Sequence, residues 1–296
     1  MCLDRSRVFQ LLIPLLLAAT ANVSPTRANA SELIVFQKQP AAAGDVSRQT
    51  IECDLAMEMS IRQGGQVVQA QNQTIERKQL RELTILNVGQ QAPTRARIKF
   101  EESSVGLKTA DNPPQSSPQP VTGKIYLVTR NQDRLAITYP DGSAPPEIET
   151  AIVAQNMESF GLPNPIANFF NERKIQIGET IQLPNQIARE LLGFPDTVQN
   201  ITQFQLRLTE TKNVRGKKCA VFRIRLIADN AEAASLKMDL GGSLLLEIGT
   251  CRTVAVQLNG PVGASEMHGP PQGQFEVASK GNIRVAVESD YQAKVR

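Results

Sequence analysis

The sequence is poor in the residues that most enzymes and nucleic-acid-binding proteins use at their sites. The 296-residue chain has one histidine, no tryptophan and 4% aromatic residues. With His268 alone, a single chain can build neither a Ser-His-Asp or Cys-His catalytic set nor a multi-histidine zinc site. The scarcity of aromatic rings also argues against recognition of bases or sugars by stacking.

Other chemical motifs are missing as well. The sequence has no Gly-rich phosphate loop and no calcium-binding loop spacing. His268 falls in a Gly/Pro-rich stretch, while the carboxylate pairs Glu52/Asp54 and Glu101/Glu102 lie on or at the end of strand-like segments, which is typical of solvated surfaces. We therefore predict that the protein is not an enzyme and that it holds neither a metal nor a cofactor.

The N-terminus has the three parts of a secretory signal peptide. Arg5 and Arg7 precede a leucine-rich apolar run over residues 8–21, and Ala28-Asn29-Ala30 offers small residues at the positions that signal peptidase reads. The alternative is a retained membrane anchor, but a spanning helix needs about 20 apolar residues and this run is shorter. We expect residues 1–30 to be a signal peptide that is removed together with Cys2, which leaves no transmembrane span.

The charge that remains after cleavage is nearly balanced. Removal of residues 1–30 takes away three arginines and one aspartate, so the remaining 266 residues hold 29 basic and 28 acidic side chains, a net charge of +1. A balanced charge argues against binding to nucleic acid or to an anionic membrane surface. The sequence thus predicts an exported protein, periplasmic or extracellular, with no nucleic-acid partner.

Alternation of apolar and polar residues with period 2 dominates the chain from residue 49 onward. Such alternation is typical of half-buried strands. It runs over residues 50–61, 66–77, 83–88, 95–101, 124–130, 134–139, 203–209, 219–228, 236–248, 254–258 and 275–291. We interpret residues 49–296 as a single β-rich domain and residues 31–48 as a mobile leader with a short apolar patch at Leu33–Phe36.

Two segments interrupt the alternation with proline and glycine. Residues 103–122 contain four prolines, and they are read as an exposed loop, with a polyproline ligand as the alternative. Residues 259–273 are also expected to form a loop, before the last strand or strands.

Helical spacing replaces the strand pattern in the middle of the chain, at about residues 146–193. Short helices are expected over 148–161, over 165–170 with Asn164 as the N-cap, and over 187–192 with Asn185 as the N-cap. The fold class that follows is mainly β, with a large curved antiparallel sheet or half-open barrel and two or three short helices inserted mid-chain.

Three cysteines remain after the predicted cleavage. Cys53 belongs to the apolar face of its strand and is expected to be a buried, inert thiol. Cys219 and Cys251 both share the parity of polar neighbours, so we place them on the polar face and predict a disulfide between them. The alternatives are two free surface thiols or pairing with another chain, because one strand separates the two and the Cα limit for a bridge is about 7 Å.

The order of elements across residues 49–291 resembles, at a distance, the lipoprotein-carrier (LolA/LolB-like) architecture. The resemblance implies a curved antiparallel sheet with helices beneath it that enclose an apolar cavity. It assigns no functional residue, and this chain departs from those carriers in its greater length, its short helices and its lack of a lipobox.

The continuous apolar strand faces suggest a binding role. We expect the inner face of the sheet to bind an apolar small molecule or a hydrophobic segment of an envelope protein. The alternative is a structural or protein-interaction component of the cell envelope with a filled core. The predicted pocket lining consists of Leu55, Met57, Met59, Phe169, Phe170, Leu191, Phe222 and Met238.

Overall fold

The computed structural model describes residues 33–90, 92–109, 112–192, 201–230, 234–270 and 273–292, and the predicted signal peptide lies outside them. Strands dominate these residues. The first half of the chain contributes β2 (Val46–Gln63), β3 (Gln66–Val88), β4 (Pro93–Thr109), β5 (Asn112–Pro118), β6 (Ile125–Asn131) and β7 (Arg134–Thr138). The second half contributes β9 (Thr180–Gln182), β10 (Ile201–Val214), β11 (Lys217–Asn230), β12 (Ala234–Glu247), β13 (Thr253–His268) and β14 (Phe275–Gln292).

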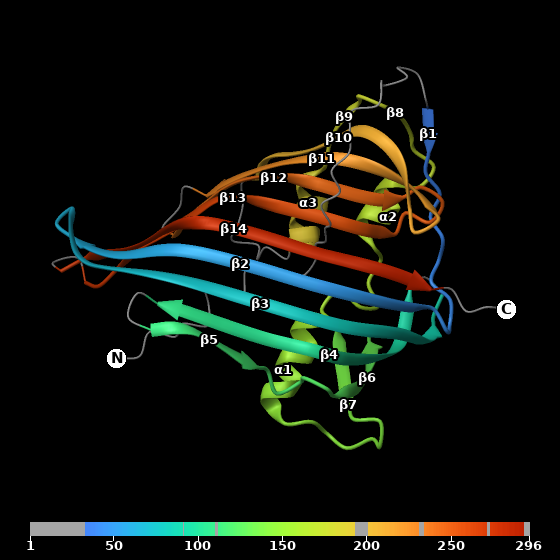
Figure 1. Ribbon diagram of the computed structural model, residues 1–296, viewed down its shortest axis with the longest axis horizontal. Helices are drawn as coiled ribbons and strands as arrows, with labels where there is room; N and C mark the ends of the chain where they lie inside the picture. Colours follow the sequence, from blue (N-terminus) through green and yellow to red (C-terminus); the bar gives the residue numbers. More distant parts are fainter. Residues whose placement is uncertain are drawn as a thin grey trace.

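Within the described ranges these strands form one 12-stranded antiparallel sheet (Figure 1). The order is β7-β6-β4-β3-β2-β14-β13-β12-β11-β10-β9, with β5 paired to β4 beside this path. The pairing of β14 with β2 joins the two halves of the chain along their full length, from Phe275–Gln63 to Gln292–Val46. The predicted mainly β, curved antiparallel sheet is confirmed, and it is open, with β7 and β9 at its edges.

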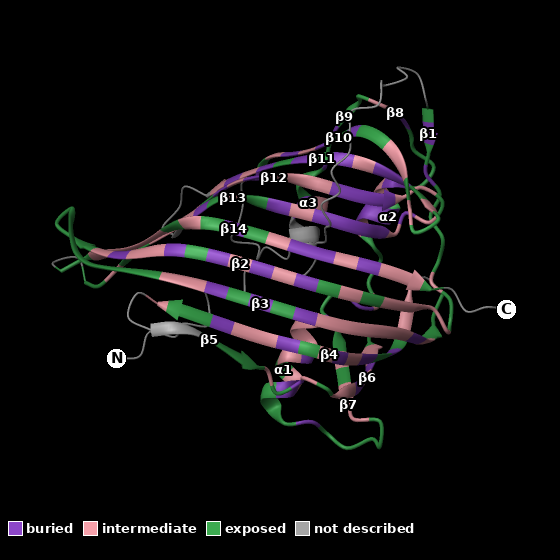
Figure 2. Cartoon of the chain, viewed as in Figure 1, coloured by how far each residue is buried: buried purple, intermediate pink, exposed green. Residues whose placement is uncertain are grey.

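Alternating burial along the strands follows the alternation in the sequence. In β2, Ile51, Cys53, Leu55 and Met57 are buried, and the residues between them are half-buried or exposed. Figure 2 shows the resulting bands of buried and exposed residues along the long strands. β2 therefore presents one apolar face, which must be covered.

Three helices in the described residues lie on one face of the sheet, here called the inner face (Figure 1). They are α1 (Glu147–Asn156), α2 (Pro165–Phe170) and α3 (Asn185–Leu192). The side chain of Asn164 accepts a hydrogen bond from Ala167 N at 3.0 Å, so the predicted N-cap of α2 is confirmed. The short helices inserted mid-chain are thus confirmed, although α1 ends at Asn156, before the predicted end at residue 161, and α3 begins at Asn185 itself, which was predicted as its N-cap.

Two separate hydrophobic clusters form beneath the sheet. The first joins β2 and β10–β14 to α2 and α3, and at its centre the rings of Phe36, Phe170 and Phe222 lie with centroids 5.1–6.0 Å apart. The second joins β3, β4 and β6 to α1 and contains Phe100 and Tyr126, whose ring centroids are 6.0 Å apart. The sheet is therefore covered at two places by different helices.

Residues 33–36 differ from the predicted mobile leader. β1 (Leu33–Val35) pairs antiparallel with β8 (Lys174–Gln176), and Phe36 is fully buried. Gln37 N donates to Ile248 O at 3.0 Å, which continues the attachment to the end of β12. The apolar patch was correctly located, but it packs into the first cluster because burying Phe36 and Ile34 outweighs the cost of ordering four residues.

The two segments expected to be loops contain strands. The Pro-rich tract pairs as β5 with β4, at a place where it needs ladder hydrogen bonds on one side only, as proline requires. β13 runs through Gly260 and Pro261 to His268 without a break in its pairing to β14. A Cβ at Gly260 would lie 2.2 Å from Asp239 O, so this glycine allows the two backbones to approach closely.

Candidate functional site

The inner face is covered unevenly along the long strands. Near α2 and α3 its side chains are buried, whereas toward the β2–β3 and β13–β14 turns, which project on the left in Figure 1, they are half-buried or exposed. We call this less covered part the open strip. Its apolar members in the described residues are Met59, Ile61, Val105, Leu107 and Val277.

The predicted pocket residues divide between the first cluster and the open strip. Leu55, Met57, Phe170, Phe222 and Met238 are buried together in the first cluster, and Phe169 packs against it. Met59 is half-buried in the open strip, and the side chain of Leu191 lies outside the described part of the chain. Their role as pocket lining stays a prediction.

Two arginines lie on the inner face between the two clusters. Arg77 and Arg81 are on β3, where the inward positions read Ile75, Arg77, Gln79, Arg81. Arg77 is 5% exposed and Gln79 is 2% exposed, while Arg81 is half-buried. A pair of cations therefore occupies positions where the strand pattern otherwise places apolar residues.

Both guanidinium groups converge on Asn156, the last residue of α1. Arg77 Nη2 donates to Asn156 Oδ1 at 3.4 Å, and Arg81 Nη1 donates to the same atom at 3.1 Å and to Asn156 O at 3.0 Å. Arg81 Nε also donates to Gln49 Oε1 at 2.9 Å. Arg77 Nε and Gln79 Oε1 have no hydrogen-bond partner in the part of the chain that the structure describes.

Burial disfavours the charged form of both side chains. It lowers the pKa of Arg77, and the adjacent Cys53 thiol counteracts this only in part. Burial, together with repulsion from Arg77, lowers the pKa of Arg81 to about 10. Both groups remain protonated at neutral pH, so the site carries two positive charges in a region of low dielectric constant.

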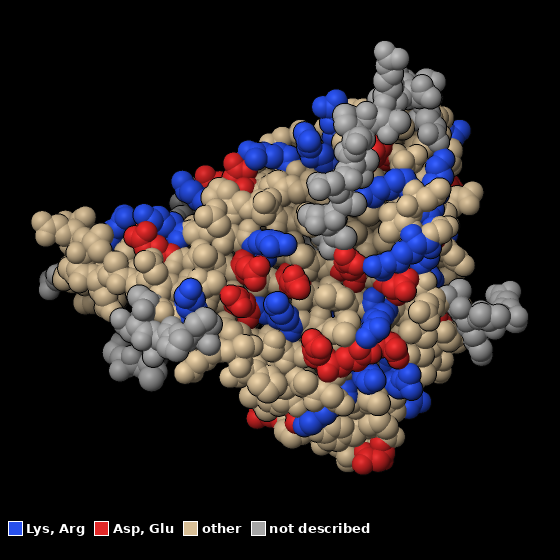
Figure 3. All heavy atoms as spheres, viewed as in Figure 1, with Lys and Arg blue, Asp and Glu red and all other residues tan. Residues whose placement is uncertain are grey.

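On the opposite face of the sheet, charged side chains form salt bridges with one another. Figure 3 views this outer face, where basic and acidic side chains are interspersed. Salt bridges between neighbouring strands on this face include Lys280–Glu58, Arg62–Glu276 and Arg225–Asp239. No such bridge to Arg77 or Arg81 is present among the described residues.

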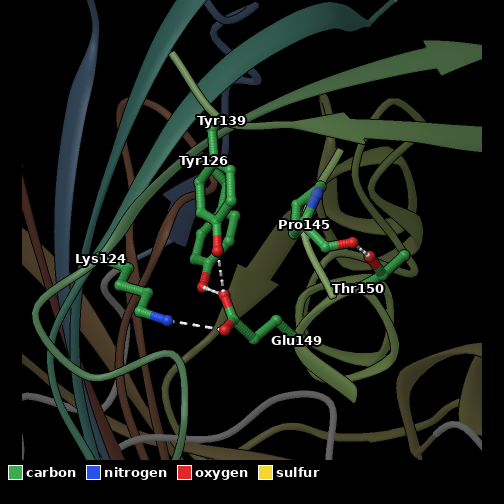
Figure 4. A network of polar contacts seen from close by, with 6 residues as sticks. All are labelled: Lys124, Tyr126, Tyr139, Pro145, Glu149 and Thr150. Carbon is green, nitrogen blue, oxygen red and sulfur yellow. Dashed lines mark hydrogen bonds and ion pairs between the residues drawn. The ribbon is translucent and has the colours of Figure 1, made fainter. Parts of the chain in front are cut away.

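A second buried charge, on Glu149, is fully partnered (Figure 4). Glu149 lies in the first turn of α1 and is 4% exposed; its Oε1 accepts from Lys124 Nζ at 2.6 Å, and its Oε2 accepts from the hydroxyls of Tyr126 and Tyr139 at 2.7 Å each. Burial alone would raise the pKa of Glu149, but these three donors outweigh it and hold the pKa below its usual range. Since the carboxylate is occupied by structural donors, we interpret it as the attachment of α1 to β6 and β7.

Two of the three described cysteines differ from their predicted positions. Cys53 is buried as expected, but Cys219 and Cys251 are also fully buried rather than on the polar face. Cys219 pairs with Glu247 in the β11–β12 ladder, and Cys251 follows in the turn after β12 with a φ of 53°. All three are free thiols, so the predicted Cys219–Cys251 disulfide is not formed in the structure.

The remaining candidate residues lie at separate places on the surface. His268 ends β13, stacks on Phe275 at a centroid distance of 5.7 Å and lies 3.3 Å from a carboxylate oxygen of Glu266. Glu101 pairs with Arg48 in a salt bridge on the outer face. Among the described residues, no three His, Cys, Asp or Glu side chains gather in a way that could hold a metal ion.

The sequence pattern did not predict the arginine pair, because the residues of β3 were predicted to form two separate strands. Residues 66–77 were read as a polar strand and residues 83–88 as another, whereas the structure has one strand from Gln66 to Val88. If the alternation of Leu83 and Ile85 is extended backwards, it places Arg81 and Arg77 on the same inward face. That parity was the available signal.

No described helix is long and apolar enough to cross a lipid bilayer. No family model and no curated protein matches the chain.

Solved structures give only distant likenesses. A structure on lipid–protein interactions in lipovitellin is 13% identical, with a TM-score of 0.37; the match covers 88% of this chain and 26% of that one. DynF from the dynemicin biosynthesis pathway of Micromonospora chersina is 9% identical, with 91% and 90% of the two chains covered and a TM-score of 0.17. The translocator domain of the autotransporter NalP from Neisseria meningitidis is 9% identical, with 82% and 88% covered and a TM-score of 0.18. Likenesses this distant carry no inference about ligand or function.

Proposed function

We propose that the protein is an exported, non-catalytic binding protein whose inner sheet face takes up an apolar ligand. The observation that carries the proposal is the open strip, in which apolar side chains of β2, β4 and β14 continue the buried inner face and are left partly uncovered by the described helices. Apolar surface that stays accessible on a concave face gains free energy when a hydrocarbon replaces water there, by about 25 cal/mol per Å². The resemblance of the element order to lipoprotein carriers agrees with this role.

The proposal is tested by calorimetric titration of the full chain with oleyl alcohol, a neutral long-chain probe. A Met59→Glu substitution places a charge in the open strip and should weaken binding by about tenfold or more, because a carboxylate beside a hydrocarbon chain loses hydration. Ala56→Glu is the matched control, since Ala56 is exposed on the outer face of the same strand. Equal binding by both variants, or no binding by the unsubstituted chain, would contradict the proposal.

The alternative function is a structural or interaction component of the cell envelope. It is favoured by Val67, Val68 and Met267, three exposed apolar residues near the ends of the neighbouring β2–β3 and β13–β14 hairpins. This alternative requires a stable protein partner. Crosslinking in native envelopes distinguishes the two functions, since a carrier of a small ligand needs no such partner.

A further inference from the structure

The contacts of Arg77 and Arg81 with the end of α1 do not fully compensate the positive charges of the two side chains. The C-terminal end of a helix offers about half an elementary negative charge, and Asn156 adds only neutral acceptors. Two full positive charges face it from Arg77 and Arg81. At least one positive charge on the inner face is therefore left without compensation within the described residues.

Arg77 is the less satisfied of the two. A guanidinium has five N–H donors, and the one hydrogen bond of Arg77 to a described residue, Asn156 Oδ1, is long at 3.4 Å. Its Nε is buried with no partner among the described residues, and the same holds for Oε1 of Gln79, two residues further along the same face. A buried, unpaired cation is unfavourable, whereas an oxyanion that binds a guanidinium fork bidentately forms one of the strongest polar contacts in proteins.

The surroundings of the pair are apolar on the side that leads to the open strip. In the sheet register Arg77 lies beside Cys53 on β2 and Val105 on β4, and the next inward neighbours are Leu55 and Ile75. On the opposite side Arg81, Asn156 and Gln49 remain half-buried, so the charged end of the site is accessible. An anionic group followed by a hydrocarbon chain fits this arrangement of charge and apolar surface.

We propose that the ligand of the inner face is an anionic amphiphile, whose carboxylate or phosphate binds between Arg77 and Arg81 while its chain lies along the open strip. This proposal rests on the proposed function and specifies its ligand class. The two guanidinium groups supply the recognition of the head group, and the apolar inner positions of β2 and β4 supply the contact with the chain.

The test is calorimetric titration of the full chain with three probes: oleate, oleyl alcohol and inorganic phosphate. Oleate should bind about tenfold or more tightly than oleyl alcohol, as expected for hydrogen bonds to a charged group. Inorganic phosphate should bind more weakly than oleate, because it lacks the chain.

Substitutions on β3 test which side chain makes oleate bind more tightly than oleyl alcohol. Arg77→Met should abolish the preference for oleate and leave oleyl alcohol binding in place, whereas Arg77→Lys, which keeps the charge, should retain part of it. Lys78→Met is the matched control, because Lys78 is exposed on the outer face at the next position, and it should retain the full preference for oleate.

Thermal unfolding of the same variants provides a second readout. Without ligand, Arg77→Met should unfold at a higher temperature than the unsubstituted chain, since it removes an unpaired buried charge.

Each contrary result overturns a different part of the two proposals. Equal binding of oleate and oleyl alcohol, unchanged in Arg77→Met, would overturn the ligand class and leave the proposed function in place. Failure of both long-chain probes to bind would overturn both proposals. Phosphate binding as tight as oleate binding would identify an anion site without an apolar component. A lower unfolding temperature of Arg77→Met without ligand would mean that Arg77 acts only as an attachment for α1.

Discussion

At the scale of single residues, the two buried charges beneath the sheet contrast in how they are compensated. Glu149 receives three hydrogen bonds, one of them from a cation, whereas Arg77 has a single long one. A buried charge that is fully hydrogen-bonded stabilises its surroundings, and one that is not leaves a free energy cost that a ligand can relieve. The first residue therefore belongs to the scaffold, and the second belongs to the candidate site.

The role of Glu149 in stability can be measured by substitution and pH. Glu149→Gln should lower the free energy of unfolding by about 1–3 kcal/mol at neutral pH, because three donors lose a charged acceptor. Since the pKa of Glu149 is lowered in the folded state, its contribution is present above the unfolded pKa and is lost as the pH falls through the folded value. The difference between variant and unsubstituted chain in urea unfolding should therefore shrink in acid.

Glu147→Gln is the control for this measurement, since Glu147 is exposed in the same helical turn. It should change stability little at any pH. A Glu149→Gln variant as stable as the Glu147→Gln variant at neutral pH would mean that the network does not hold α1 in place.

The thiols provide a second measurement at this scale. Burial raises the pKa of Cys53, Cys219 and Cys251 to about 11 each, so the folded protein should react slowly with iodoacetamide at pH 8. After unfolding without a reductant, mass spectrometry should find all three modified. If Cys219 and Cys251 are modified only after reduction, the disulfide expected from the sequence exists in solution.

At the scale of elements, close backbone contacts explain why glycine and proline occur inside long strands. Gly260 lies in β13 where Asp239 of β12 approaches, and Gly281 of β14 lies against Ala56 of β2 in the same way. In a sequence, glycine and proline together suggest a loop, and in this sheet they mark places where strands come close or an edge needs no donor.

Substitution of Gly260 tests this interpretation. Gly260→Ala should destabilise the protein by about 1–3 kcal/mol, because its Cβ would overlap a backbone oxygen that cannot easily move. Gly241→Ala is the control, since a Cβ at Gly241 on the neighbouring strand meets nothing within 4 Å. Urea unfolding measures both variants, and equal stability would contradict the close contact.

The elements differ in how far the sequence allowed them to be predicted. Period-2 alternation identified the strands of the sheet, and the Asn164 cap with Pro165 identified α2, because each of these signals is local. The merging of two segments into β3 was not predicted, because the inward positions Arg77, Gln79 and Arg81 are polar and interrupt the apolar alternation between Ile75 and Leu83. The parity of Arg77 and Arg81 with Leu83 places them on the inward face only if the strand is continuous, whereas their convergence on Asn156 depends on tertiary packing that the sequence does not contain.

At the scale of the whole molecule, an open sheet with two separate clusters leaves part of its inner face uncovered by the described helices. Different helices cover the two regions, the arginine pair lies between them, and the open strip lies beyond them. The inner face therefore carries the positive charges of the arginine pair next to the apolar side chains of the open strip. The proposed anionic amphiphile has both properties, a charged group and an apolar chain.

The most direct test of this account is organic extraction of the full chain, purified without detergent, followed by mass spectrometry of the extract. The account predicts that a long-chain anionic amphiphile is recovered in roughly equimolar amount, and that Met59→Glu lowers its recovery while Ala56→Glu does not. Extracts that contain no such molecule, from protein that also fails to take up oleate or oleyl alcohol, would contradict the account.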